Sequence, residues 1–402
     1  MPVKLAESTP VPHQKAVFGL PLPRITLLNL CAQIGIVLTG GAVRLTGSGL
    51  GCSEVPNCTE DSFFPTPELG VHGLIEFSNR GLGYLVGIIA ILTFVAVWRS
   101  RRRDLYPAAI AVAIGVAAQG VIGAITVLTE LNPWTVMGHF LVSMTLIAAA
   151  TWLHLNAAGL SANRAGLTGK RRMLVHSLIG MLSVVLVLGT VTTGSGPHSG
   201  DLGAGRTGFD LALVSRLHAN AVYLLVALTV LLLIVTRSGP KLVQRAAGWV
   251  LAAELLQGVI GIVQYNLNLP VTVVLAHMLG AALLVVATAR LWFLASRAPA
   301  GQSRRETLAR PEPALEGSTS PPARATLTDE GDRLPGGNVG GAWRVGETVR
   351  RGTGRWTPAV HALLTHLGPR LAHVPAVLGS SPRLTGRARL TRSCPPSRPE
   401  SS

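Results

Sequence analysis

The feature that most constrains this chain is a repeat that spans about the first 300 residues. The segment Gln119-Gly-Val-Ile-Gly123 returns as Gln257-Gly-Val-Ile-Gly261. A histidine follows each glutamine at the same distance along the chain, His139 after the first and His277 after the second. An internal repeat of this length predicts two stacked copies of one structural unit, each with its own site.

Further pairs of residues keep the same order in the two copies. Thr46-Gly-Ser-Gly49 returns as Thr193-Gly-Ser-Gly196. Asn79 and His218 occupy corresponding places, since a tyrosine follows each of them five residues later. The second copy therefore offers two histidines, whereas the first offers one histidine and an asparagine. This difference predicts that the two sites have different chemistry.

The apolar residues gather in eight blocks that approach or reach the roughly 20 residues needed to cross a bilayer. Of the 402 residues, 48% are hydrophobic and 13% are charged, which is too apolar for a water-soluble protein. Lipid cannot satisfy open backbone groups, so uninterrupted helices are expected. We predict an all-α membrane protein whose eight transmembrane helices form two pseudo-symmetric four-helix bundles. The expected spans are 26–43, 77–98, 107–128, 135–158, 173–192, 215–236, 246–265 and 270–295.

The placement of charge predicts the orientation of these spans. The formal net charge is +16, and basic residues gather in the loops after the second, fourth and sixth spans, with acidic residues in the opposite loops. Because basic loops lie on the cytoplasmic side, both termini are expected in the cytoplasm and the chain in the cell membrane. Juxtamembrane lysine and arginine account for the charge, so no nucleic-acid partner is expected. The long polar start predicts no cleavable signal peptide.

Four regions follow from this pattern. Residues 1–24 are expected to be a cytoplasmic segment, 25–160 a first four-helix bundle and 161–297 a second. From 298 to 402 proline, glycine, serine, arginine and threonine dominate, which predicts a disordered basic cytoplasmic tail.

Two cysteines, Cys52 and Cys58, share the first external loop. Disulfides persist in an oxidising compartment, so this placement favours a disulfide, with two free thiols as the alternative.

Ionisable groups within the membrane mark functional positions, and here they collect near the outer ends of the even-numbered spans. The residues concerned are Glu76, Asn79, Arg80, His139, Arg216, His218 and His277. Two histidines on neighbouring helices of a bundle, such as His218 and His277, are suited to holding a six-coordinate haem. Zinc is the competing metal, but it needs a third or fourth ligand that the sequence does not place nearby. Arg80 and Arg216 are expected either to neutralise haem propionates or to reach the lipid headgroups.

The first copy predicts a more open site. His139 has only Asn79 as its counterpart, and asparagine is a poor iron ligand. Glu76 lies three residues before Asn79 on the same helical face, where a carboxylate could stabilise a cationic intermediate or move a proton. The alternative is a simple ion pair between Glu76 and Arg80. His72 lies a further four residues back and is a candidate substitute imidazole.

The ordered set of motifs resembles haem A synthase over about residues 20–297. The resemblance is carried by Gly40-Gly-Ala-Val-Arg-Leu-Thr-Gly-Ser-Gly-Leu-Gly-Cys52, Glu76-Phe-Ser-Asn-Arg80, Gly138-His139, Arg216-Leu-His218 and Ala276-His277. It implies oxidation of a ring methyl group of haem O, through an alcohol, to the formyl group of haem A for terminal oxidases. It also implies haem b between His218 and His277 and the substrate haem O at His139.

The same resemblance implies roles for the outer loop and for partners. Glu76 matches the essential glutamate of the family, and Cys52 and Cys58 match a loop cysteine pair expected to form a disulfide. Asn79 departs from members that carry a histidine there, which predicts single-histidine binding of the substrate haem. The implied partner is haem O synthase, with an electron partner of unknown identity, a homo-oligomer as a possibility, and haem sites toward the outer face. The alternative function is a membrane b-type cytochrome that only transfers electrons.

Overall fold

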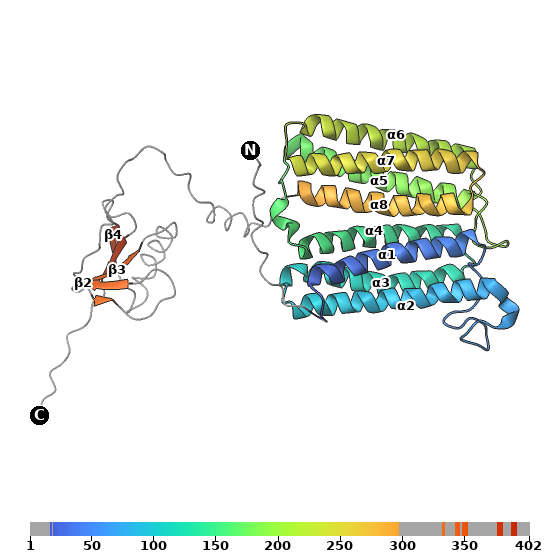
Figure 1. The fold of residues 1–402 in the computed structure, drawn as a ribbon, viewed down its shortest axis with the longest axis horizontal. Helices are drawn as coiled ribbons and strands as arrows, with labels where there is room; N and C mark the ends of the chain where they lie inside the picture. Colours follow the sequence, from blue (N-terminus) through green and yellow to red (C-terminus); the bar gives the residue numbers. More distant parts are fainter. Residues whose placement is uncertain are drawn as a thin grey trace, which may run out of the picture. The chain divides into compact units, whose positions relative to one another are not determined.

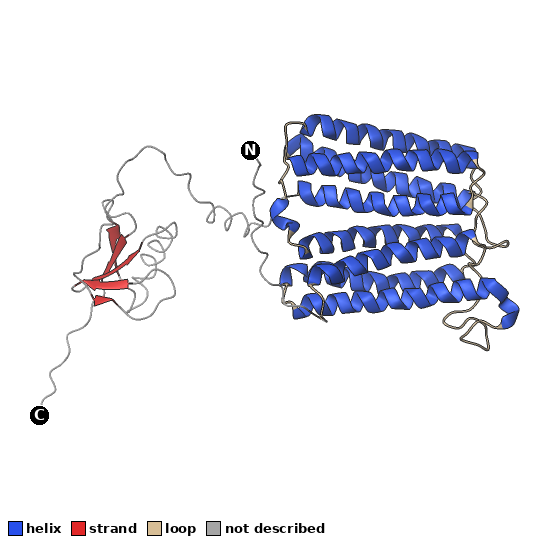
Figure 2. Ribbon diagram, in the orientation of Figure 1, coloured by secondary structure: helices blue, strands red, loops and turns tan. Residues whose placement is uncertain are grey.

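The computed structural model describes residue 17, residues 19–296 and the backbone of five short strands beyond them. Within 19–296 eight long helices follow one another (Figures 1 and 2). They are α1 (Leu22–Leu45), α2 (Gly70–Arg99), α3 (Tyr106–Leu128), α4 (Pro133–Ala157), α5 (Gly169–Ser195), α6 (Leu211–Thr236), α7 (Lys241–Asn266) and α8 (Val271–Ala295). All eight are long and apolar enough to cross a membrane, which confirms the predicted spans. The main difference is α2, which starts seven residues earlier than expected and so includes His72 and Glu76.

Local sequence signals set where several helices begin. The side chain of Asn132 caps α4 by accepting the Trp134 N–H at 3.0 Å, and Asp210 caps α6 by accepting the Leu213 N–H at 2.7 Å. Such caps satisfy amides that have no partner inside the helix. Pro133 follows Asn132, at a position where the missing N–H costs nothing.

The helices contact one another in two groups of four. Helix α1 packs on α2 and α4, and α3 fills the opposite side between α2 and α4. The second group is built in the same way from α5, α6, α7 and α8, and helix α8 joins the groups by packing on α1 and α4 (Figure 1). A continuous cluster of buried apolar side chains runs through the second group and into α1, α3 and α4. The helices thus divide into two groups of four by their contacts, and the pseudo-symmetry of these groups stays a prediction.

The repeat is also present in local backbone geometry. The turn between α3 and α4 has positive φ at Glu130 and Leu131, at 51° and 57°. The turn between α7 and α8 has positive φ at Asn268 and Leu269, at 58° and 59°. In each turn the second residue donates its N–H to a carbonyl five residues back at 2.8 Å. Left-handed backbone is rare for such residues, so its occurrence at equivalent places indicates one unit used twice.

Contacts at the C-terminal ends of α1 and α5, and in the loops that follow them, join the two groups. Arg44, at the end of α1, donates from Nε to His198 O at 2.8 Å and from Nη2 to Thr193 O at 3.3 Å. Beside it, the Gly49 N–H donates to Gly200 O at 2.9 Å. These contacts reach the end of α5 and the loop between α5 and α6. The two TGSG turns are therefore connected to each other by hydrogen bonds.

The connection between the groups is also fixed. It contains a short 3-10 helix, Leu160–Asn163, at the predicted domain boundary. The guanidinium of Arg164 lies 4.4 Å from the ring centre of Trp152 and 4.1 Å from that of Phe293. Cation–π contacts of this kind tie the end of α4 to the end of α8.

The C-terminal region contains an element that the sequence analysis did not anticipate. Clustering of contacts separates Glu312–Ser402 as a second unit. Five short antiparallel strands in it form a sheet of order β1-β2-β3-β5-β4. The strands are β1 (Asp332–Arg333), β2 (Ala342–Val345), β3 (Thr348–Gly352), β4 (Ala376–Ser380) and β5 (Arg387–Thr391). The paired backbone at these strands differs from the disorder predicted for 298–402. The rest of 298–402 lies outside the described residues.

Removal of the Arg44 contacts is expected to loosen the joint between the two groups. Arg44→Met deletes two hydrogen bonds from a charged donor, a loss of about 2 kcal/mol. The midpoint of thermal unfolding in detergent should fall by roughly 4 °C. Arg24→Met is the matched control, because Arg24 is an exposed arginine at the other end of the same helix. Equal midpoints for the two variants would contradict the assigned role of Arg44.

Candidate functional site

The candidate ligand residues lie at one end of the helical region. The helices alternate in direction, so the first turns of α2, α4, α6 and α8 share that end. His139 and His277 each stand six residues into their helix and His218 stands seven residues in, while Asn79 stands nine residues into the longer α2. The four residues therefore lie near the same end of the helices.

In the second group each histidine faces a glycine of the preceding helix. A Cβ atom built on Gly189 of α5 would lie 3.1 Å from Cε1 of His218. One built on Gly261 of α7 would lie 3.5 Å from Cε1 of His277. The ring of His218 bonds through Nδ1 to Val185 O at 3.1 Å, and Nδ1 of His277 is buried without a partner among the described residues. A backbone bond at Nδ1 fixes the tautomer whose Nε2 is free to bind a metal.

The first group repeats this arrangement with one change. A Cβ atom on Gly123 would lie 3.5 Å from Cε1 of His139, the same distance as in the second group. A Cβ atom on Gly40 would lie 3.9 Å from the amide nitrogen of Asn79. Asn79 Oδ1 and His139 Nδ1 are buried without partners among the described residues. Each of the four ligand positions therefore faces a glycine, and this leaves space beside the polar side chains.

These residues fit a haem better than a small metal ion. Among the described residues, no three histidine, cysteine or carboxylate side chains are grouped closely enough to hold a metal ion. Zinc needs three or four such ligands, whereas a haem supplies four nitrogens of its own and needs only one or two from the protein. Paired imidazoles flanked by glycines, with buried ring nitrogens left over, match that requirement.

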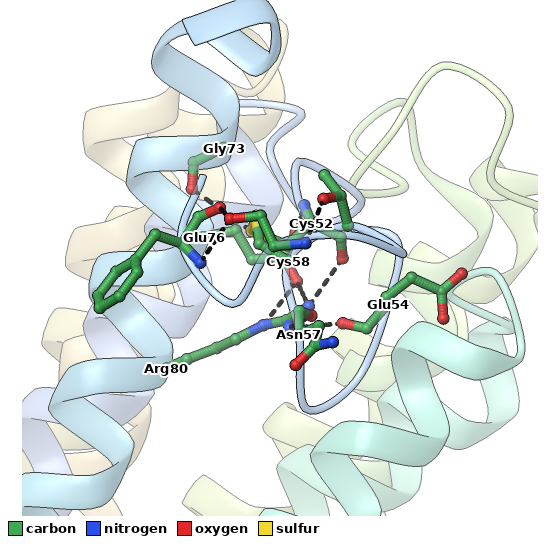
Figure 3. Close-up of a disulfide and its surroundings, with 10 residues drawn as sticks. Cys52, Glu54, Asn57, Cys58, Gly73, Glu76 and Arg80 are labelled. Carbon is green, nitrogen blue, oxygen red and sulfur yellow. Dashed lines mark hydrogen bonds and ion pairs between the residues drawn. A yellow bond between two sulfur atoms is a disulfide. The ribbon is translucent and has the colours of Figure 1, made fainter. Parts of the chain in front are cut away.

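Glu76 is held firmly near the N-terminal end of α2 (Figure 3). Its side chain is buried, with 5% of the residue exposed. Oε2 accepts the Cys52 N–H at 2.6 Å, and Oε1 accepts from Nη2 and Nε of Arg80 at 2.6 and 3.2 Å. The ion pair that the sequence left as an alternative is present, and the same carboxylate also anchors the cysteine loop.

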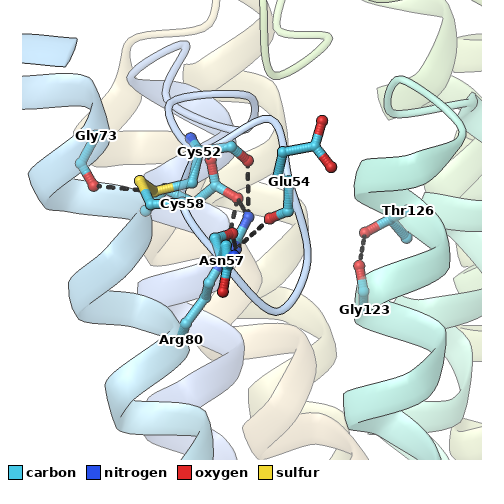
Figure 4. Close-up of polar contacts among 9 residues, drawn as sticks. Cys52, Glu54, Asn57, Cys58, Gly73, Arg80, Gly123 and Thr126 are labelled. Carbon is cyan, nitrogen blue, oxygen red and sulfur yellow. Dashed lines mark hydrogen bonds and ion pairs between the residues drawn. A yellow bond between two sulfur atoms is a disulfide. The ribbon is translucent and has the colours of Figure 1, made fainter. Parts of the chain in front are cut away.

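Arg80 uses every donor of its guanidinium. Besides Glu76, it donates from Nη1 to Glu54 O at 2.7 Å and Asn57 O at 3.0 Å, and from Nη2 to Cys52 O at 2.7 Å. A guanidinium has five N–H groups, and all are paired in this arrangement. None is left for a haem propionate, so the expected propionate contact of Arg80 is replaced by a structural role. Figure 4 shows this loop together with Thr126, whose hydroxyl donates to Gly123 O at 2.6 Å on α3.

The predicted disulfide between Cys52 and Cys58 is present. The two residues are 0% and 1% exposed, so the bridge is shielded by its own loop. Cys52 also carries the N–H that binds Glu76 and the carbonyl that binds Arg80. The disulfide, the carboxylate and the guanidinium therefore form one connected unit.

The two remaining candidates lie outside this unit. Nδ1 of His72 pairs with Ser48 Oγ at 2.8 Å, and Ser48 in turn pairs with Thr46 at 2.9 Å. His72 is exposed and supports the TGSG turn, which gives no support to its role as a substitute imidazole. Arg216 is exposed near the start of α6, and its contact with a propionate stays a prediction.

Loss of Arg80 is expected to destabilise the loop that contains Cys52 and Cys58. Arg80→Met leaves Glu76 buried without its ion-pair partner and frees three loop carbonyls, a change that costs several kcal/mol in a buried setting. Local opening should then expose the disulfide, and reduction of Cys52–Cys58 by dithiothreitol should be at least about tenfold faster. Thiol alkylation followed by mass analysis measures this rate. Arg102→Met is the control, since it breaks the more exposed Arg102–Asp104 pair at the opposite end, and an unchanged rate in Arg80→Met would rule the idea out.

Comparison with known proteins gives consistent results. Residues 23–197 match the family described as cytochrome oxidase assembly protein, COX15-CtaA. This segment contains the disulfide, Glu76, Asn79, Arg80 and His139, while His218 and His277 lie beyond it.

Several bacterial proteins named heme A synthase are similar to the chain. The protein of Bartonella bacilliformis is 28% identical over 164 residues, 32% of this chain and 45% of that protein. The protein of Granulibacter bethesdensis is 27% identical over 205 residues, 42% of this chain and 54% of that protein. The protein of Geobacillus kaustophilus is 27% identical over 169 residues, 40% and 52% respectively. The matches thus span about half the length of these relatives. The comparisons confirm the resemblance seen in the motifs, since the chain is similar to the cytochrome oxidase assembly protein family and to proteins named heme A synthase.

Proposed function

We propose that the protein is a haem A synthase, which oxidises a ring methyl group of haem O to a formyl group. The observation that carries this proposal is the set of four ligand positions at one end of the helices, each facing a glycine. Three are histidines and the fourth, Asn79, lies one turn from a buried carboxylate. The similarity to proteins named heme A synthase supports the same conclusion.

The second group is proposed to hold the resident haem b. His218 and His277 would ligate it from α6 and α8, and Arg216 near the start of α6 is placed to neutralise a propionate. When bound, this haem supplies reversible one-electron transfer. The protein contributes two fixed imidazoles and a surrounding of apolar side chains that keeps water out.

The first group is proposed to hold the substrate, haem O. His139 would bind its iron on one face, and Asn79 would leave the other face weakly ligated. Glu76 is held in place by the Arg80 guanidinium and the Cys52 N–H, so its carboxylate would present a negative charge beside the substrate. Such a charge favours the positive charge that develops on the methyl carbon as it is oxidised.

The proposed setting follows from the distribution of charge in the sequence. The protein would lie in the cell membrane with both termini in the cytoplasm and the haem sites toward the outer face. Haem O synthase is the partner expected to supply the substrate. The pathway also requires an electron acceptor, and the product would serve assembly of a terminal oxidase.

Conversion of haem O in a host without haem A tests the proposal. Co-expression with a haem O synthase, followed by haem extraction and mass analysis, should give haem A or its alcohol precursor. Glu76→Gln should lower product at least about 100-fold, the size of effect expected for loss of one charge-stabilising group. Glu68→Gln, which changes an exposed carboxylate of the same loop region, is the control. Bound haem b without any conversion of haem O would instead favour the alternative function, an electron-transfer cytochrome. In that case the Glu76–Arg80 pair would have a structural role only.

Asn79→His is expected to close the open iron position. Gly40 leaves room opposite residue 79, as Gly189 does opposite His218, so an imidazole can be accommodated. Substrate haem should then become six-coordinate and low-spin, with turnover reduced because the iron is more firmly held. Electron paramagnetic resonance of the purified variant reads the spin state. A spectrum identical to that of the natural protein would show that residue 79 does not reach the iron.

A further inference from the structure

The repeated Gln-Gly-Val-Ile-Gly segments make the same contact in both groups. Nε2 of Gln119 on α3 donates to His139 O on α4 at 2.8 Å. Nε2 of Gln257 on α7 donates to His277 O on α8, also at 2.8 Å. In each group a glutamine thus binds the main-chain carbonyl of the histidine proposed to hold iron.

The last glycine of each segment completes the contact. It lies four residues after the glutamine, on the same face of the helix. Gly123 faces the ring of His139 and Gly261 faces the ring of His277, each with a built Cβ at 3.5 Å from Cε1. The first residue of the motif therefore donates a hydrogen bond to the backbone carbonyl of the histidine, and the fifth residue leaves space for its ring.

The two copies differ in what surrounds the glutamine. In the first, Ser143 accepts a hydrogen bond from Gln119 and donates to His139 O at 3.0 Å. In the second, the residue four after His277 is Ala281, which has no hydroxyl. Gly280 instead leaves the space that the Gln257 side-chain amide occupies, since a Cβ there would collide with it. The second contact thus depends on Gln257 and Gly280 alone.

We propose that Gln119 and Gln257 are positioning residues, which set the height and rotation of the helix that carries each iron-binding histidine. The inference rests on the proposed function for the identity of the ligand. His139 and His277 have no partner for ring Nδ1 among the described residues, so the ring is not oriented through that atom. The backbone must then provide the orientation, and a hydrogen bond between helices in an apolar environment is a suitable fixing point.

Replacement of Gln257 tests the proposal in the second group. Gln257→Met keeps the length of the side chain and removes the donor. Haem b should leave the purified full-length protein about tenfold faster, measured by transfer to excess apomyoglobin, the size of effect seen when the partner of a metal ligand is removed. The low-spin resonance of the remaining haem should broaden, because the imidazole planes are no longer fixed. Gln257→Glu, which can donate as the neutral acid, should restore part of the natural behaviour.

Three further variants separate the specific role from general damage. Gln244→Met is the matched control, because Gln244 on α7 donates to Thr236 O of α6 at the opposite end of the helix. Gln119→Met should leave the haem b signal unchanged and affect only substrate haem. Gly280→Ala should reproduce Gln257→Met, because the added methyl group displaces the glutamine amide without altering it.

The outcomes distinguish this proposal from the proposed function. If the natural protein holds haem b with a six-coordinate spectrum that His277→Ala abolishes, the ligand assignment stands. A release rate and resonance in Gln257→Met equal to those of Gln244→Met would then overturn the positioning role. Absence of any six-coordinate haem in the natural protein would instead remove the function on which the inference is built.

Discussion

A bilayer offers no hydrogen bonds, and this constraint decides where the polar residues of this protein are found. Each polar group inside the span needs a partner from another helix, from its own turn or from a bound group. Near the N-terminal end of α2, Glu76 and Arg80 satisfy one another and the backbone of a loop. At the same end of the helices, Nδ1 of His139, Nδ1 of His277 and Oδ1 of Asn79 are buried without a partner among the described residues.

The two groups combine equal scaffolding with unequal chemistry. The two groups have similar geometry in three features. These are the turns before α4 and α8, the glutamine contacts, and the glycines opposite the candidate ligand positions. The side chains added to this frame differ, with a carboxylate, a disulfide loop and Asn79 on one side and a second histidine on the other. Under the proposed function, a resident cofactor needs firm ligation on both faces, whereas a substrate must enter and leave. The same frame would then serve two tasks through a small number of replacements.

The sequence was sufficient for features governed by length and by repetition. Apolar block length predicted all eight spans, and the repeat predicted that His139, His218 and His277 would share a depth. The hydrogen bonds that Arg80 donates to loop carbonyls could not be predicted, because they depend on the backbone conformation of that loop. The contact of His72 could not be predicted for the same reason, since its partner Ser48 lies in a turn 24 residues away. The strands beyond residue 330 were missed because composition averages over short paired segments.

The reason for the repeated Gln-Gly-Val-Ile-Gly motif is found only in the folded structure. Gln119 and Gln257 were visible as a repetition, but only the contact with a carbonyl twenty residues away explains their identity. The space that Gly40 keeps beside Asn79 also bears on how easily this position can change. Asparagine and histidine codons differ by one nucleotide, so a single base change would place an imidazole opposite Gly40. Under the proposed function, that one change would convert an open iron site into a closed one.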